Sequence, residues 1–246
     1  MQLTVINSNS AGNAYILSND REALLIECGV AFTKIKEALN FDLKKVVGCI
    51  LTHEHGDHAK SVKDVLMAGI NVYATDGTHH ALNTYKSHRA ITTFSGDQFK
   101  IGGFTIAPFD VEHDVAEPVL FLIHHEECGK ILFLTDSYYC KWQFNGLNNI
   151  IIEANYDQRI LDQRLKDGAT LESLRDRVIT SHMSLKTCKG LLAANDLSAV
   201  QKIVLIHLSD GNSNAAQFKL EVEQQTGKPV YIAEPGLKIP FNKTPF

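Results

Sequence analysis

The sequence is poor in the features that mark secreted and membrane-spanning proteins. Its 246 residues include five cysteines, an odd number without any C-x-x-C pair, which argues against a disulfide framework or a cysteine-rich zinc site. No apolar run is long enough to span a membrane, and the first residues lack the basic segment of a signal peptide. We therefore expect a cytoplasmic protein with no membrane partner.

A basic excess is also missing. The chain has 24 Lys and Arg residues against 28 Asp and Glu residues, and its net charge of −4 does not favour a nucleic-acid partner. The hydrophobic share of 44% and the charged share of 21% are typical of a globular protein. Because no linker or low-complexity stretch interrupts the chain, we predict a single domain over residues 1–246. The sequence carries no signal for the oligomeric state.

One short stretch concentrates the polar chemistry. The apolar segment Val46–Leu51 predicts a buried strand, and the apolar spacing within Ala59–Ala68 predicts a helix. Between them, residues 52–58 read T-H-E-H-G-D-H and place three imidazoles and two carboxylates on one loop. These are the donors that zinc, manganese and iron prefer as divalent ions. A solvated, histidine-rich loop is the alternative, which the dense H-x-H-x-D-H spacing makes the weaker interpretation.

Three further donors also follow predicted strands. His113, Asp136 and His207 come after the apolar segments Phe104–Phe109, Lys130–Leu134 and Lys202–Ile206, respectively. A carboxylate at the end of a buried strand is costly unless it is paired or binds a cation. Because α/β architectures place their sites at the carboxyl ends of strands, we expect these donors to meet the histidine-rich loop.

The remaining patterns predict strands and helices in alternation. The other predicted strands are Met1–Ile6, Ala14–Leu17, Ala23–Ile26, Ile70–Ala74, Val119–His124, Asn149–Ile152 and Val230–Ala233. The other predicted helices cover residues 78–88, 158–177, a segment capped by Ser184 and a segment capped by Ser213. Residues 7–13 read as a turn-rich loop. Histidines outside the donor clusters are predicted to lie at the surface, namely His79, His80, His88, His124 and His125.

The donor motifs resemble those of a known family. T-H-x-H-x-D-H at residues 52–58 is similar to the signature of the metallo-β-lactamase superfamily. Within that superfamily the chain resembles the WalJ/YycJ-like subgroup, which is linked to DNA exonuclease activity. S-x-S-x-G-N at residues 8–13, E-H-D-x-x-E-P at residues 112–118 and S-H-x-S at residues 181–184 carry that closer similarity. The resemblance implies a four-layer αββα sandwich, with two mixed sheets packed face to face and helices outside.

The resemblance also implies a site with two divalent metal ions, either zinc or manganese, with iron as a further candidate. One ion would be bound by His53, His55 and His113, and the other by Asp57, His58 and His207, with Asp136 bridging them. A metal-bound hydroxide would attack the substrate, with Asp57 and His182 in catalytic roles. The implied substrate contacts are Ser10, Asn13, Asn155, His182 and Ser184. Two positions depart from the family pattern, because Glu27 stands in place of Asp and Tyr156 in place of His.

His182 has a rationale of its own in the sequence. It lies just before the helix that Ser184 is predicted to cap, and a helix N-terminus offers unpaired N–H groups to a phosphate. The imidazole could then orient or protonate a phosphoester. The alternative is a hydrogen-bonded structural histidine.

Three functions remain open at this stage. The first is a metal-dependent hydrolase of phosphodiesters, with DNA as a candidate substrate. The second is a thioester or lactam hydrolase with the same site. The third is a non-catalytic metal-binding regulatory module, which the number of donors disfavours, because structural zinc sites are usually closed and mononuclear.

Overall fold

Two seven-stranded sheets form the centre of the computed structural model, which describes residues 1–244. The first sheet runs in the spatial order β14 (Lys238–Pro240), β1 (Gln2–Asn9), β2 (Gly12–Ser18), β3 (Ala23–Ile26), β4 (Val46–Ile50), β5 (Val72–Ala74) and β6 (Ala90–Thr92). The second runs β13 (Val230–Ile232), β12 (Lys202–Ile206), β11 (Leu147–Glu153), β10 (Gly129–Leu134), β9 (Val119–His125), β8 (Phe104–Asp110) and β7 (Phe99–Ile101).

Both sheets are mixed in the same way. In the first sheet, β14, β1, β2 and β3 pair antiparallel, and β3 to β6 pair parallel. In the second sheet, β7 to β10 pair antiparallel, and β10 to β13 pair parallel. The parallel strands read as near-continuous apolar runs because both of their faces are covered.

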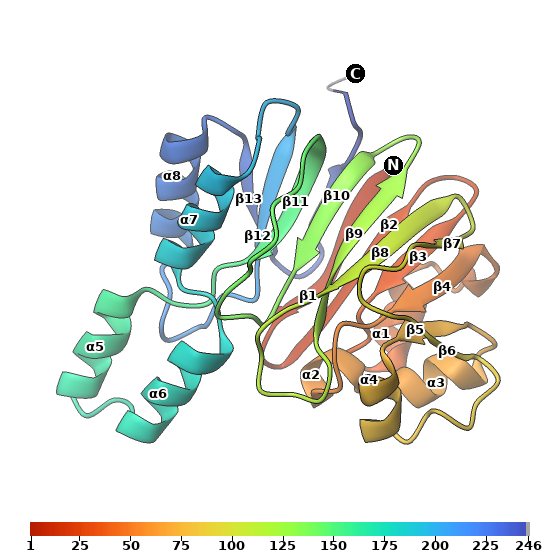
Figure 1. Cartoon of the computed structure of the whole chain (residues 1–246), viewed down its shortest axis with the longest axis horizontal. Coiled ribbons are helices and arrows are strands. Elements are labelled where there is room, and N and C mark those ends of the chain that lie inside the picture. The colour runs from red at the N-terminus through yellow and green to blue at the C-terminus, as the bar shows by residue number, and fades with distance from the viewer. Residues whose placement is uncertain (245–246) are drawn as a thin grey trace.

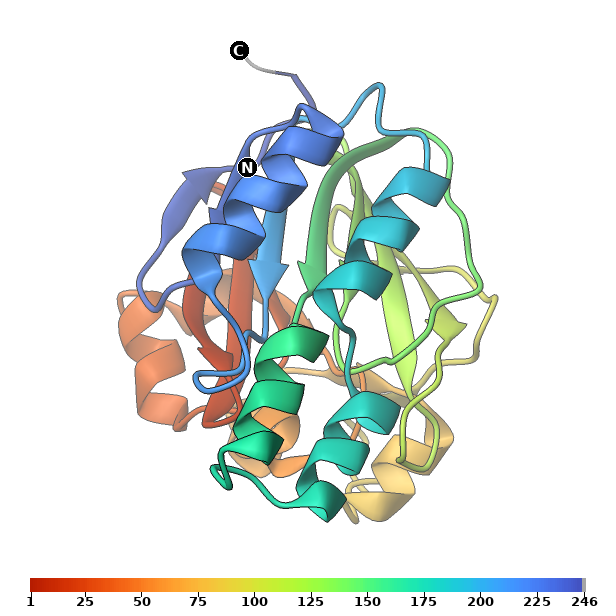
Figure 2. The same cartoon turned by 90° about the vertical axis from the view of Figure 1, so that its left-hand side faces the viewer.

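Helices cover the outer faces of the sandwich (Figure 1). The helices are α1 (Phe32–Ala38), α2 (Gly56–Ala59), α3 (Val62–Met67), α4 (Asp76–Ala81), α5 (Gln158–Lys166), α6 (Glu172–Ser181), α7 (Leu185–Ala194) and α8 (Ala215–Thr226), with a short 3₁₀ turn at Leu43–Lys45. The buried faces of α1, α2 and α3 pack on the first sheet, and those of α7 and α8 pack on the second. Figure 2 shows α7 and α8 lying across their sheet. The predicted αββα sandwich is therefore confirmed.

The central layer is apolar from edge to edge. Side chains from the inner faces of both sheets form one cluster, in which Tyr15 of β2 meets Phe133 of β10 edge to face at 5.5 Å between ring centroids. A buried apolar layer of this kind fixes the two sheets relative to each other. Loops at the ends of strands from both sheets can then share one site.

Several predicted boundaries were wrong. Residues 7–13 form the tip of a β-hairpin, because β1 runs to Asn9 and β2 begins at Gly12. The predicted helix 59–68 is the shorter α3, which follows the single turn of α2, and the predicted helix 158–177 is divided at Gly168, whose φ is 68°. The predicted helix 78–88 is the shorter α4. The side chain that caps α8 is that of Asn214, not Ser213.

Two histidines predicted at the surface are buried. His79 contacts the Thr84 hydroxyl at 2.9 Å, and His125 lies 3.2 Å from the Glu22 carboxylate. Both are therefore satisfied by structural partners. His80, His88 and His124 are exposed, as predicted. Within residues 1–244, no helix is both long and apolar enough to cross a membrane.

Candidate metal centre

The loop that follows β4 carries the densest group of predicted site residues. The backbone N–H of Thr52 donates to Oε1 of Glu27 (3.2 Å), and the N–H of Cys28 donates to the carbonyl of His58 (2.8 Å). Residues after β3 thus hold both ends of the loop. The single turn of α2 then sets the directions of Asp57 and His58.

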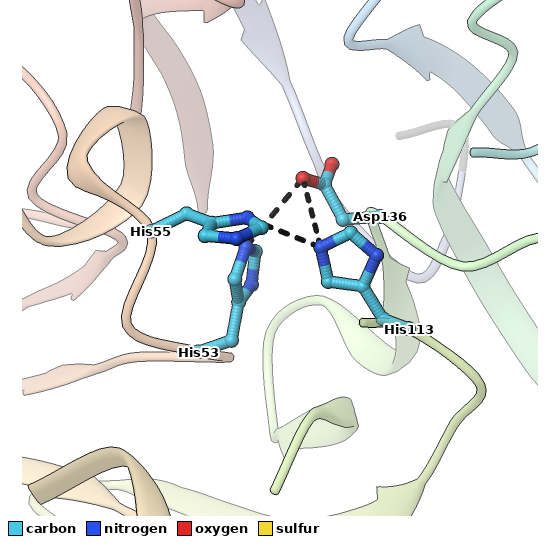
Figure 3. A group of neighbouring side chains, drawn as sticks. All are labelled: His53, His55, His113 and Asp136. Atoms are coloured by element: carbon cyan, nitrogen blue, oxygen red, sulfur yellow. Dashed lines mark hydrogen bonds and ion pairs between the residues drawn. The ribbon is translucent and has the colours of Figure 1, made fainter. Parts of the chain in front are cut away.

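Three imidazoles and one carboxylate converge at the first half of the site (Figure 3). Nε2 of His53 lies 3.5 Å from Oδ2 of Asp136, and Nε2 of His113 lies 3.8 Å from the same oxygen. Nε2 of His113 is also 3.2 Å from Nδ1 of His55. The donor atoms of these four residues all lie within 4.8 Å of one another. Three nitrogens and one oxygen around one point match the usual ligand number of a tetrahedral zinc site.

A second group of donors lies beside the first. Nε2 of His58 lies 3.2 Å from Oδ2 of Asp136, and Nε2 of His207 lies 3.5 Å from Oδ1. Oδ2 of Asp57 is 3.3 Å from Nε2 of His207 and 3.4 Å from Nε2 of His58. These four residues also place their donor atoms within 4.8 Å. Asp136 therefore belongs to both groups, one oxygen facing the first and both facing the second.

The backbone is unusual where it presents these donors. Asp136 and His207, each just after a strand, have left-handed φ values of 44° and 53°, and Glu27 has a φ of 61°. Such conformations cost a non-glycine residue about 1–3 kcal/mol, and they concentrate at functional sites. This backbone conformation turns the side chains of Asp136 and His207 toward the centre that the two donor groups share.

The charges of the site suit a cation. Burial would raise the pKa of Asp136, but His207 and His58 hold that pKa well below its usual range. Burial likewise opposes ionisation of Asp57, yet hydrogen bonds with His207 and His58 keep its pKa low. Burial lowers the pKa of His53 and of His113, so these imidazoles are neutral at pH 7. Anionic carboxylates and neutral imidazoles are the forms that bind metals.

His58 has the opposite tendency. Burial lowers its pKa, but the charge of Asp136 outweighs that effect with help from Asp57 and Glu27, and raises the pKa of His58 well above its usual value. A proton on His58 would neutralise part of the charge of these carboxylates. A cation bound at this position must displace that proton.

Unsatisfied buried atoms provide a direct test of whether a metal fits. Nε2 of His53 is buried and has no hydrogen-bond partner within residues 1–244. A buried polar atom without a partner costs about 1–3 kcal/mol. Nε2 of His53 points at the first donor group, where a divalent cation would satisfy it. The donor set therefore fits a divalent metal.

Comparisons with known proteins agree with this geometry. Residues 23–208 match the family model described as the beta-lactamase superfamily domain. The chain belongs to the beta-lactamase superfamily. It is thus a hydrolase of the metallo-β-lactamase type, and its two sheets and outer helices are those of that fold. The alternative of a non-catalytic module has no support here.

Two relatives are similar over most of their length. The chain is 26% identical to exodeoxyribonuclease YycJ of Bacillus anthracis, over 91% of this chain and 88% of that protein. It is also 26% identical to exodeoxyribonuclease WalJ of Streptococcus pneumoniae, over 85% of this chain and 82% of that protein. Among solved structures, the metallo-beta-lactamase fold protein YhfI from Bacillus subtilis superposes with a TM-score of 0.74 at 19% identity, covering 97% of this chain and 99% of that one.

A cavity of about 460 Å³ opens over the donors of this superfamily member. His55, Asp57, His113, Asp136 and His207 line it, so the centre is accessible from solvent. A volume in this range is typical of a small-molecule site.

Of the five predicted substrate residues, three line the cavity and two do not. Ser10, Asn155 and His182 line the cavity. Asn13 is fully buried beneath the donors, where its Nδ2 lies 3.1 Å from Nε2 of His58. Ser184 caps α7 by accepting from the N–H of Thr187 (3.0 Å). Neither Asn13 nor Ser184 is among the described residues that line the cavity.

Asn155 touches a donor as well as the cavity. Its Nδ2 lies 3.0 Å from Nδ1 of His207 and donates to the His207 carbonyl (2.9 Å). This contact fixes the ring so that Nε2 faces the centre. Tyr156, by contrast, is buried with its carbonyl accepting from the N–H of Leu185 (2.8 Å). It is not one of the cavity-lining residues in the described chain.

Glu27 and Glu54 are two carboxylates near the donors that could orient an imidazole. Oε2 of Glu27 lies 3.5 Å from Nδ1 of His58, consistent with that role. Glu54 has a different contact, because its Oε1 accepts from the backbone N–H of Ala116 (2.8 Å). Glu54 therefore ties the metal loop to the segment that follows His113.

Sequence reasoning overlooked Glu153 and Ser8. Glu153 is fully buried, and its Oε1 accepts from Nδ1 of His182 (2.7 Å) while Oε2 accepts from the N–H groups of Ser137 and Met183. The available signal was an acidic residue directly after an apolar strand, as for Asp136. The Ser8 hydroxyl accepts from the backbone N–H of His207 (2.9 Å), a contact between distant segments that no local pattern indicates.

Gly29 provides a test of this architecture. A methyl group at Gly29 would overlap the carbonyl of Asp57, so Gly29→Ala must displace the turn that carries Asp57 and His58. Because a displacement of about 1 Å can cost about 100-fold in a preorganised site, we expect metal affinity to fall by about 10–100-fold. Competition with a chromogenic chelator would measure it, on protein whose folding is verified by circular dichroism.

The matched control is Gly190→Ala on α7, where the added methyl meets no atom within 4 Å. This control should bind metal as the wild type does. Metal affinity within twofold of wild type in Gly29→Ala would contradict the described link between the β3 end and α2.

Proposed function

We propose that the protein is a dinuclear metal-dependent hydrolase of phosphodiesters, with DNA as its substrate. The observation that carries this proposal is the position of Asp136, whose carboxylate faces both donor groups. A carboxylate shared in this way reduces the repulsion between two closely spaced cations. When bound, two divalent ions, zinc or manganese, would supply Lewis acidity and a water of lowered pKa.

The substrate class has separate support. Two relatives with matches across most of the chain are named exodeoxyribonucleases. The cavity also presents polar groups beside the donors, among them Asn155 and the imidazole of His182, whose pKa is raised to about 9. This lining suits an anionic phosphodiester better than a thioester or a lactam. The five cysteines are buried and free, which supports a reducing location such as the cytoplasm.

His182 is proposed as the residue that assists the leaving oxygen. Its Nδ1 donates to Glu153 (2.7 Å), which fixes the ring while one edge lines the cavity. Burial lowers the pKa of His182, but Glu153 and Asp136 outweigh it and raise that pKa to about 9. Nδ1 is also 3.9 Å from Oδ1 of Asp136, so a role as metal ligand is the alternative to test.

A substrate panel together with Asp57→Ala tests the proposed activity. With added manganese or zinc, the wild type should hydrolyse bis(p-nitrophenyl) phosphate and DNA, but not a thioester or a lactam. Asp57→Ala should lower kcat by at least about 100-fold, because Asp57 faces the centre and contacts two of its imidazoles. Its melting temperature in the presence of a chelator should match the wild type, since Asp57 contributes to stability mainly through bound metal.

Preference for the thioester or lactam would overturn the proposed substrate class. Wild-type activity in Asp57→Ala would show that Asp57 is not part of the machinery.

His182→Ala tests the leaving-group role. We expect unchanged metal content and a kcat on DNA lowered by about 10²–10⁴-fold, because general-acid assistance is lost. The loss should be smaller for nitrophenyl esters, whose leaving groups need no proton. The control is His88→Ala, which removes an exposed imidazole and should leave both rates unchanged. Loss of metal in His182→Ala would instead make His182 a ligand, and equal loss on both substrates would make it a positioning residue.

A further inference from the structure

Helix α6 forms one wall of the cavity. Leu174, Arg177, Val178 and Ser181 all line it, at positions i, i+3, i+4 and i+7 of the same helix. This spacing places them on a single face. The helix continues past the donors, and its first residues are open to solvent, with Leu171 73% and Leu174 52% exposed. Leu174 thus presents an exposed apolar side chain in the wall of the cavity, where a bound ligand can contact it.

The position of α6 relative to the centre is fixed at its carboxyl end. The Ser181 carbonyl accepts from Nδ1 of His113 (3.0 Å), and the Ser181 hydroxyl donates to Asp114 (3.1 Å). The opposite end is tied to α5 by Arg175, which lies 3.2 Å from Asp162. Figures 1 and 2 show α5 and α6 together at the end of the sandwich that also carries α2. Helices α5 and α6 (residues 158–181) therefore form an arm of two helices beside the opening of the cavity.

Arg177 differs from the other arginines of this arm. Arg175 is paired with Asp162 and Asp176, and Arg164 donates to the carbonyl of Ala169. The guanidinium of Arg177 has no hydrogen bond or ion pair within residues 1–244. A guanidinium that faces a cavity and has no protein partner can bind a phosphate through two parallel N–H···O hydrogen bonds.

The size of the cavity indicates which phosphate Arg177 would meet. The cavity volume of about 460 Å³ suits a small ligand. A DNA strand whose scissile phosphate lies at the two donor groups must therefore leave the cavity through its opening. The α6 wall combines a cation with apolar side chains. That combination matches a strand, because proteins that hold single-stranded DNA pair cationic contacts to the backbone with apolar contacts to the bases.

We propose that Arg177 binds the phosphate next to the scissile one in a single-stranded DNA substrate, and that Leu174 packs against the adjoining nucleoside. This assignment rests on the proposed nuclease function. It makes Arg177 and Leu174 determinants of strand binding, without a part in the bond-breaking step.

The test compares a strand with a minimal substrate. Arg177→Ala should raise KM for a single-stranded oligodeoxynucleotide by about tenfold, the loss expected for one charged hydrogen-bonded contact. Its kcat/KM for bis(p-nitrophenyl) phosphate should stay within about twofold of wild type, because this ester has no neighbouring phosphate. Arg177→Lys keeps the charge but loses the planar guanidinium, so its KM for the oligodeoxynucleotide should lie between those of the wild type and Arg177→Ala.

Salt dependence separates charge from apolar contact. Binding is measured by fluorescence anisotropy in the Asp57→Ala background, so that the oligonucleotide stays intact. Arg177→Ala should reduce the slope of log affinity against log salt by about one. Leu174→Ala should weaken binding and leave that slope unchanged. The control Arg21→Ala removes a 79% exposed arginine from the turn between β2 and β3 and should change neither quantity.

The outcomes distinguish this inference from the function on which it rests. If the wild type degrades DNA while Arg177→Ala keeps the wild-type KM and salt slope, the role of Arg177 is overturned and the nuclease function stands. If the wild type hydrolyses bis(p-nitrophenyl) phosphate but no DNA, the proposed substrate fails, and the inference fails with it. An equal loss on both substrates would place Arg177 in the reaction centre and contradict its role as a strand contact.

Discussion

The site depends on the placement of one buried carboxylate between two sets of imidazoles. Asp136 follows β10 in a left-handed conformation, and its oxygens face donors from both halves of the chain. A fully desolvated carboxylate is stable only when opposite charge or a cation compensates it. In the structure, Nε2 of His58 and Nε2 of His207 lie 3.2 Å and 3.5 Å from its oxygens, and both imidazoles hold the pKa of Asp136 low. The surrounding loops are arranged to hold this group.

The αββα sandwich makes that arrangement possible. The first sheet supplies the loop after β4, and the second supplies Asp136 and His207 after β10 and β12. The apolar layer between the sheets fixes these strand ends in register. Hydrogen bonds then cross between the sheets, as from the His207 N–H to Ser8. Preorganisation of the donors is therefore a property of the whole sandwich.

Most of the site was predictable from the sequence, because each donor directly follows an apolar strand and strand ends meet in α/β folds. All seven predicted metal donors converge in the structure, although their binding of metal stays a prediction. Features that depend on tertiary contacts were harder to predict from the sequence. The short edge strands β6, β7 and β14 have weak local patterns, and His79 and His125 are buried only because partners distant in sequence satisfy them. Glu153 was overlooked because its role depends on His182.

The count of bound metal ions tests this account most directly. The protein is loaded with zinc or manganese, freed of loose metal by gel filtration, and assayed for metal and protein by elemental analysis alongside activity. Because Asp136 lies between two complete donor groups, we predict two ions per protomer in the active form. One ion or fewer per protomer with full activity would contradict the shared-carboxylate centre.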